Sequence, residues 1–232
     1  LITMATSNKV IVALDSNNIR KTISLVSILK NEVFAFKLGY EFFYNYGVEG
    51  YKAIYKISPK IFLDLKLHDI PNTVQNGMIA INKMKPLLTT IHISGGEDMM
   101  SASFIKRKFT KILGVTVLTS IDNNQVRKLY NEKNVENVVK KFAKLAKKNK
   151  LDGIVCSPKE IKIVRKIVGK NFLIVTPGIR LNNFEIKGDD QKRVTSPKKA
   201  LELGADLIVI GRPITEAKKP LDEIRKINIL LG

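Results

Sequence analysis

The sequence has few of the residues on which disulfides and most transition-metal sites depend. It contains one cysteine, so no disulfide can form within the chain. Cys156 lies in the apolar segment LDGIVCS, which predicts a small buried residue, and a single cysteine fits a reducing cytoplasm, the location we predict. Two histidines are too few for a histidine-rich metal site. A magnesium site made of carboxylates is not excluded by this count.

Long apolar runs are missing as well. No run approaches the roughly 18 residues that a membrane-spanning helix needs. Residues 1–8 have neither the basic start nor the long apolar region of a secretory signal. We therefore expect no membrane partner and no leader. Residues 1–3 precede Met4, and we place the folded domain at residues 4–232.

Acidic residues are scarce relative to basic ones. The chain has 40 Lys and Arg against 21 Asp and Glu, a net charge of +19, which can indicate a nucleic-acid partner. The lysines, however, are scattered along amphipathic segments such as residues 138–150, VVKKFAKLAKKNK, where they are typical of a solvated helix face. No helix-turn-helix, zinc-finger or aromatic RNA-binding pattern accompanies them. We expect no nucleic-acid partner, and a basic nucleic-acid-binding protein remains the non-enzymatic alternative.

Short β-rich segments alternate with longer amphipathic ones along the whole chain. Each of the eight predicted strands is followed by a candidate helix; the strands are residues 9–15, 33–39, 60–69, 88–95, 111–120, 151–157, 172–179 and 207–213. Strict alternation predicts parallel strands with right-handed crossovers. Eight repeats in 232 residues favour a closed (β/α)8 TIM barrel, a single α/β domain. An open doubly wound sheet is the alternative, but no GxGxxG motif follows the first strand.

Two connections are longer than usual for such a fold. Residues 121–136 are polar and rich in asparagine, and residues 180–196 read RLNNFEIKGDDQKRVTS. Long polar loops in a compact barrel are often lids over an active site. We expect this role for residues 180–196.

The third predicted strand carries charges in an apolar run, IFLDLKLHDIPNT. Side chains alternate along a strand, so Asp64 and Lys66 share one face. Asp69 follows where Pro71 must end the strand. Burying an ion is costly unless it is paired, so three charges here predict a site at the carboxyl end of the strand. A structural ion pair is the alternative.

Polar residues also gather at the other predicted strand ends. They are Asp15, Lys37, His92, Thr119, Ser120, Pro177, Arg180, Gly211 and Arg212. The glycine-containing segments TPGIR and GRP follow the seventh and eighth strands, where barrels often bind a phosphate, and Arg212 offers a bidentate fork to its oxygens. For a lone histidine such as His92, a structural hydrogen bond is a commoner role than acid–base catalysis.

These motifs occur together in one known family. The segments VALD, DLKLHDIPNT, HISGG, LTS, TPGIR, GDDQKR and VIGRP follow one another across residues 10–215. In this order and spacing the chain resembles the orotidine 5′-phosphate decarboxylases. DxKxxD alone is shared with a wider suprafamily that includes magnesium-dependent sugar-phosphate decarboxylases and aldolases, so the combination carries the resemblance.

The resemblance implies loss of CO2 from orotidine 5′-monophosphate to give UMP, the last step of de novo pyrimidine synthesis, without metal or other cofactor. Lys66 would donate the proton within a charge network of Lys37, Asp64, Lys66 and Asp69, with Asp69 and Thr73 contributed by the second subunit of a homodimer. The resemblance also implies a set of substrate-binding residues. Asp15 would bind the ribose hydroxyls, Thr119 and Ser120 the pyrimidine, and Gln191, Gly211 and Arg212 the phosphate, with Pro177 and Arg180 in the adjoining loop; Lys37 would be a further substrate-binding residue.

The residue types suit this chemistry. Departure of CO2 leaves a localised carbanion, and the sequence has no thiamine, pyridoxal or metal signature to delocalise it. An ammonium group held among carboxylates can stabilise the carbanion and then protonate it. Two enzymatic alternatives remain open: a magnesium-dependent decarboxylase or aldolase of the same suprafamily, and a Schiff-base mechanism at Lys66.

Overall fold

A computed structural model of the chain describes residues 8–104, 109–181 and 195–232. Eight parallel strands close into one barrel in chain order, each hydrogen-bonded to its neighbours in sequence and β1 to β8. They are β1 (Val10–Ala13), β2 (Ala35–Leu38), β3 (Ile61–Leu67), β4 (Leu88–His92), β5 (Lys111–Val115), β6 (Gly153–Val155), β7 (Leu173–Thr176) and β8 (Leu207–Ile210). The predicted single-domain (β/α)8 barrel is confirmed, and the open sheet is excluded.

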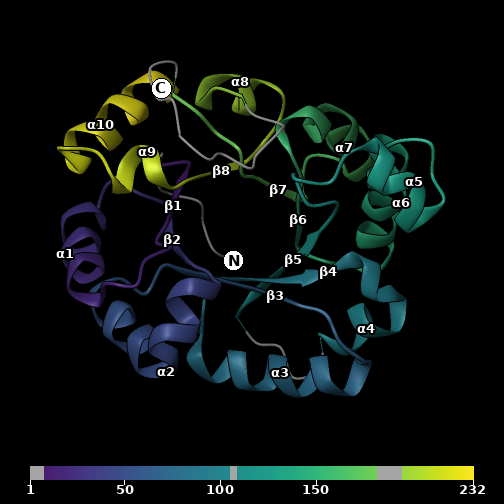
Figure 1. The fold of residues 1–232 in the computed structure, drawn as a ribbon, viewed down its shortest axis with the longest axis horizontal. Helices are drawn as coiled ribbons and strands as arrows, with labels where there is room; N and C mark the ends of the chain where they lie inside the picture. Colours follow the sequence, from purple (N-terminus) through teal and green to yellow (C-terminus); the bar gives the residue numbers. More distant parts are fainter. Residues whose placement is uncertain (1–7, 105–108, 182–194) are drawn as a thin grey trace.

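Helices form an outer ring around the strands (Figure 1). They are α1 (Ile19–Leu29), α2 (Tyr40–Ile57), α3 (Pro71–Met84), α4 (Gly96–Ala102), α5 (Asn123–Tyr130), α6 (Val135–Lys148), α7 (Ile161–Val168), α8 (Pro197–Glu202), α9 (Arg212–Thr215) and α10 (Pro220–Leu231), with short 3-10 turns η1 (Ile93–Gly95) and η2 (Pro158–Glu160). No helix within the described residues is long and apolar enough to cross a membrane.

The predicted strands extended too far at their carboxyl ends. The strand predicted at 111–120 ends at Val115, and the one predicted at 88–95 ends at His92. The loops after these strands also contain residues that are common in strands, because some of their side chains line the barrel mouth. Composition therefore resembles a strand beyond the last hydrogen bond between strands. The extra residues therefore belong to the loops in which a barrel places its site.

Residues 121–136 are not a single long loop, as the sequence suggested. They contain α5, which begins with a capping box: the Asp122 carboxylate accepts from the Gln125 backbone N–H at 3.0 Å, and the Gln125 side chain accepts from Asp122 N at 3.2 Å. The Asn-rich stretch also supplies the N-cap of α6, where the Asn134 side chain accepts from the Asn137 backbone N–H at 2.9 Å. Most of the predicted lid, residues 182–194, lies outside the described residues.

Apolar side chains form two layers separated by the strands. Along β1, Ile11 and Ala13 belong to a small cluster with Phe62, whereas Val10 and Val12 belong to the larger cluster that includes the helices. The period of two along each strand produces this division, with the small cluster filling the barrel. Cys156 is 2% exposed, which confirms the prediction of a small buried residue.

The amino-terminal end of the barrel is closed by charged hydrogen bonds. Asp206, just before β8, accepts from the backbone N–H of Ile174 at 2.7 Å and from Arg165 Nη2 at 2.5 Å. Arg165 also donates to the carbonyls of Gly204 and Phe172 at 2.8 Å each. These contacts join α7, β7 and β8 at the end of the barrel remote from the predicted site. In this fold, residues at that end mainly contribute to stability.

We predict that Asp206→Ala lowers the free energy of unfolding by about 1.5–3 kcal/mol, because it leaves the Ile174 amide and the Arg165 guanidinium without their charged acceptor. Urea unfolding measures this. Glu202→Gln is the matched control: it breaks an exposed pair with Lys199 and should change stability by less than about 0.5 kcal/mol. Equal effects of the two substitutions would contradict the role assigned to Asp206.

Candidate active site

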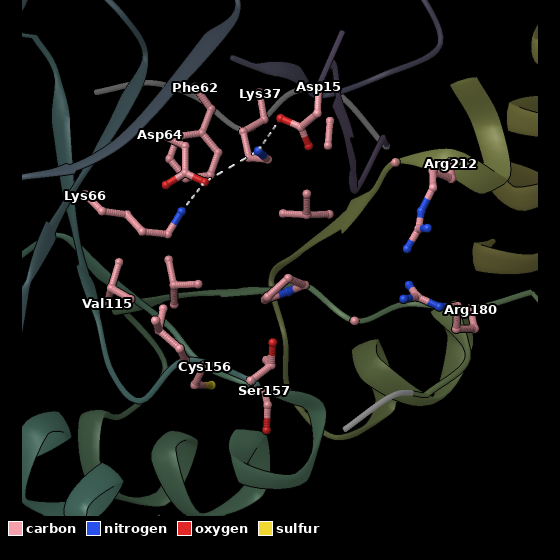
Figure 2. A pocket seen from close by; sticks show the side chains of 18 of the residues that line it. Asp15, Lys37, Phe62, Asp64, Lys66, Val115, Cys156, Ser157, Arg180 and Arg212 are labelled. Atoms are coloured by element: carbon pink, nitrogen blue, oxygen red, sulfur yellow. Dashed lines mark hydrogen bonds and ion pairs between the residues drawn. The ribbon is translucent and has the colours of Figure 1, made fainter. Parts of the chain in front are cut away.

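A pocket of about 330 Å³ opens at the carboxyl ends of the strands. Its charged lining residues come from five different strands or the loops after them; they are Asp15, Lys37, Asp64, Lys66, Arg180 and Arg212. Its apolar walls include Phe62, Val155 and Val209 from inside the barrel. Figure 2 shows the charges in two groups, with the two arginines at the end away from Lys66. The pocket therefore offers two chemically distinct ends joined by an apolar wall.

At one end, four side chains form an alternating row of charges. Lys37 Nζ lies 3.3 Å from Asp15 Oδ1 and 3.5 Å from Asp64 Oδ2. Lys66 Nζ donates to the same Asp64 oxygen at 2.9 Å. Asp64 is thus shared by two ammonium groups (Figure 2), and the side chains of Lys37 and Asp64 are only 13% and 10% exposed. The pairing predicted from the strand alternation is present.

Burial alone would lower the pKa of Lys37, but the negative charges of Asp64 and Asp15 outweigh it and raise that pKa. Burial alone would likewise raise the pKa of Asp64. The two ammonium groups and the hydrogen bonds from Lys66 and Thr90 reverse this, and the Asp64 pKa is lowered. Lys37 and Asp64 therefore both stay ionised at neutral pH.

Thr90, on the neighbouring strand β4, holds Asp64 and the backbone of Lys66 in place. It was not predicted from the sequence. Its Oγ1 donates to Asp64 Oδ1 at 2.8 Å and accepts from the backbone N–H of Lys66 at 2.9 Å. Lys66 has φ 42°, in the left-handed region, and the β3–β4 register shifts between Leu63 and Leu67. Such strain in a non-glycine residue is typical of functional sites. A threonine pair inside an apolar strand was the only available signal.

Gly39, the residue before α2, allows the row to form. A Cβ at this position would lie 2.8 Å from Asp15 Oδ1 and 3.1 Å from Lys37 Nζ. Any side chain here would push apart the two charges that face each other across β1 and β2. The absence of a side chain at Gly39 therefore lets Asp15 and Lys37 pair.

The other end of the pocket is built by the loops after β7 and β8. Gly178 has φ 77°, which favours glycine, and the turn that it makes brings Pro177 and Arg180 to the pocket. Gly211 precedes α9, which begins at Arg212. The guanidinium groups of Arg180 and Arg212 point toward one another in Figure 2. Two cationic forks in one place are suited to a multivalent oxyanion.

The pocket brings together most of the predicted substrate-binding residues, but not all. Those lining it are Asp15, Lys37, Thr119, Pro177, Arg180, Gly211 and Arg212. Ser120 is not among the residues that line it, although its neighbour Thr119 is. Gln191 lies outside the described residues. The apolar wall, including Cys156 and Ser157, was not predicted as part of the site.

Asp69 and Thr73 lie apart from this pocket within the chain. Both line a second pocket on the other side of Lys66, together with Tyr40 and His92. The Asp69 carboxylate accepts from the backbone N–H of Ile70 at 2.7 Å and, within the described residues, makes no ion pair with Lys66. A single chain thus brings together three of the four residues of the predicted catalytic network, Lys37, Asp64 and Lys66, and leaves Asp69 apart from them.

The two histidines lie against each other beside Lys66. The rings of His68 and His92 are 5.2 Å apart. Burial, with smaller contributions from His68 and Lys66, lowers the pKa of His92 to about 4, so His92 is neutral at physiological pH. No group of three or more His, Cys, Asp or Glu side chains that could hold a metal is found in the described parts of the chain.

Comparison with known proteins gives a consistent result. Residues 8–227 match the sequence model of the orotidine 5′-phosphate decarboxylase / HUMPS family. A protein named orotidine 5′-phosphate decarboxylase from Wolbachia pipientis subsp. Culex pipiens is 46% identical over 215 residues, covering 92% of this chain and 94% of the relative. One from Ehrlichia canis is 43% identical over 219 residues, covering 94% and 95%. The crystal structure of the Lactobacillus acidophilus protein of that name superimposes with a TM-score of 0.83 at 38% identity, covering 97% and 99%.

The charge row generates a prediction about stability. Asp64→Asn leaves Lys37 and Lys66 as neighbouring cations without their shared anion, so we expect the free energy of unfolding at pH 7 to fall by about 3 kcal/mol. Because the Asp64 pKa is lowered on folding, its contribution is present above the ordinary value of 3.8 and is lost as the pH falls below it. Urea unfolding of both proteins should therefore give a difference that shrinks between pH 7 and pH 3. A difference that stays constant over this range would contradict the charge-sharing account.

Proposed function

The chain belongs to the orotidine 5′-phosphate decarboxylase / HUMPS family, and from this premise we propose how its pocket converts orotidine 5′-monophosphate to UMP and CO2. This reaction is a step of pyrimidine biosynthesis, and the chain is a carboxy-lyase. The observation that carries the proposal is the two-ended pocket. A lysine held by Asp64 lies at one end and two arginines lie at the other.

We assign the substrate phosphate to Arg180 and Arg212, whose forks match its oxygens. Gln191, in the connection of residues 180–196 that begins at Arg180, is proposed as a further phosphate ligand. Asp15 and Lys37 form the part of the charge row nearer to Arg212 in Figure 2, and they suit the hydroxyl groups of the ribose as acceptor and donor. Thr119, which lines the pocket, is the proposed pyrimidine ligand, and the same role for Ser120 rests on the family resemblance alone. This orientation directs the reacting carbon of the base toward Lys66.

Lys66 performs the chemical step in this proposal. As the C–C bond to the carboxylate breaks, its electron pair stays on the ring carbon and CO2 departs. The ammonium of Lys66 stabilises this carbanion and then transfers one proton to it, giving UMP. Lys66 returns to the ammonium form by taking a proton from solvent. The nearby Asp64 carboxylate repels the substrate carboxylate, and this repulsion disappears as CO2 leaves.

In this proposal, the free energy of phosphate binding offsets the cost of placing the substrate carboxylate beside Asp64. Binding of a dianion by two arginines is remote from the reacting carbon, so it can be used to hold the substrate carboxylate against Asp64. The glycine at position 178 makes this possible, since it bends the loop that carries Arg180 toward Arg212.

A homodimer completes the network in this proposal, with Asp69 and Thr73 contributed by the partner. Exposed apolar side chains around these residues support it: Tyr40 is 45%, Tyr44 78% and Ile70 66% exposed. Within the described residues of its own chain, Asp69 has no cationic partner. This is expected of a residue whose partner lies in the second subunit. A cytoplasmic location remains a prediction from the single cysteine.

The alternatives are less well supported. The family name also covers HUMPS proteins, but the relatives at 46% and 43% identity are named orotidine 5′-phosphate decarboxylase. A Schiff base would require the Lys66 nitrogen as a free nucleophile, and in the structure this nitrogen donates a hydrogen bond to Asp64 Oδ2 at 2.9 Å. A nucleic-acid-binding role explains neither the buried charge row nor the arginine pair.

We predict that Lys66→Ala lowers kcat for orotidine 5′-monophosphate by at least about ten-thousand-fold while the protein stays folded. The loss of substrate absorbance, with circular dichroism of the variant, measures both. Wild-type turnover should be unchanged after treatment with EDTA. Lasting loss in EDTA that Mg²⁺ restores would favour the metal-dependent alternative, and borohydride trapping of a substrate adduct would favour the Schiff base.

The dimer proposal predicts complementation. Lys66→Ala and Asp69→Asn dimers should each be nearly inactive, since every site lacks one essential group. After subunit exchange in a 1:1 mixture, half of the dimers are hybrids with one complete site, so about a quarter of wild-type activity should return. A mixture of Lys66→Ala with Asp64→Asn is the matched control and should stay inactive, because these two residues act in the same chain. Failure of the first mixture to recover activity would contradict a shared site.

A further inference from the structure

Lys66 has a second neighbour that the reaction as described above does not use. Its Nζ lies 5.6 Å from the centroid of the Tyr40 ring, within the range of a cation–π interaction. Tyr40 is the first residue of α2, so it approaches Lys66 from a different element than Asp64 does. The ammonium is therefore held by a carboxylate at 2.9 Å and also lies over an aromatic ring.

Independent contacts fix the Tyr40 ring in this position. Its hydroxyl donates to the backbone carbonyl of Leu65 at 3.2 Å, which ties the ring to β3 one residue before Lys66. Its face stacks on Tyr44, with ring centroids 5.6 Å apart and an interplanar angle of 21°. Burial, with contributions from Tyr44 and Asp64, raises the pKa of Tyr40, so the phenol stays neutral and keeps its donor. The ring is thus placed by β3 and α2 and does not depend on Lys66.

Building on the proposed function, we propose that Tyr40 is a positioning residue for the reaction: its ring holds the Lys66 ammonium in place for proton transfer.

The physical need for such a neighbour follows from the lysine itself. A lysine side chain has four rotatable bonds, and one contact to Asp64 leaves it several positions to occupy. In the proposed homodimer the partner's Asp69 would be a second carboxylate near the ammonium, and each of the two carboxylates would accept one of its three N–H groups. An aromatic face attracts the cation without taking an N–H, so a proton remains free to point at the substrate carbon.

The test replaces Tyr40 by phenylalanine and then by 4-fluoro-, 3,5-difluoro- and 3,4,5-trifluorophenylalanine. Fluorine hardly changes the size of the ring but withdraws electrons from its face, which weakens the attraction for a cation step by step. We expect kcat to fall in this order, to about two- to five-fold below the phenylalanine variant, with KM unchanged. A purely structural role of the ring would leave kcat flat along the series.

The same series at position 44 is the matched control, because Tyr44 stacks on Tyr40 and is 78% exposed. All variants are assayed at a protein concentration at which sedimentation shows one oligomeric state. A graded fall at position 40 and none at position 44 supports the inference. A flat series at position 40 in an active enzyme, or an equal fall at both positions, overturns it. Absence of wild-type decarboxylation would instead overturn the proposed function, and the inference with it.

Discussion

The site depends on a single carboxylate that is shared by two ammonium groups. Asp64 lies 2.9 Å from Lys66 and 3.5 Å from Lys37, and its other oxygen accepts from Thr90. Each member of this set would be unfavourable in the barrel mouth alone, because a partly buried charge without a partner costs several kcal/mol. Together they hold Lys66, the proposed proton donor, beside Asp64 in the barrel mouth.

The fold explains why this row of charges can serve a substrate that is bound elsewhere. Parallel strands direct all their carboxyl ends to one mouth, so residues far apart in sequence, such as Asp64 and Arg212, line one pocket. Gly39 leaves room for Asp15 and Lys37 to pair, and Gly178, with φ 77°, turns the loop after β7 at the pocket. The amino-terminal end carries contacts such as Arg165–Asp206, which hold the barrel together.

The sequence was sufficient to predict the barrel and the pairing of Asp64 with Lys66, because alternation of elements and of side chains along a strand is a local property. The predicted carboxyl ends of the strands were wrong, since hydrogen bonding, and not composition, decides where a strand stops. The loop predicted at residues 121–136 was also wrong, because it contains α5. Thr90 was missed because its role depends on the register between β3 and β4, and the left-handed backbone of Lys66 on a shift in that register. Such cross-strand relations leave no pattern within one segment.

In the proposed reaction, one pocket binds the phosphate at its arginine end and the reacting carbon at its lysine end. A crystal structure with UMP tests this most directly. We expect the phosphate between Arg180 and Arg212 and ring carbon C6 within about 3–3.5 Å of Lys66 Nζ. Phosphate at Lys66, or a base turned away from Asp64 and Lys66, would contradict it.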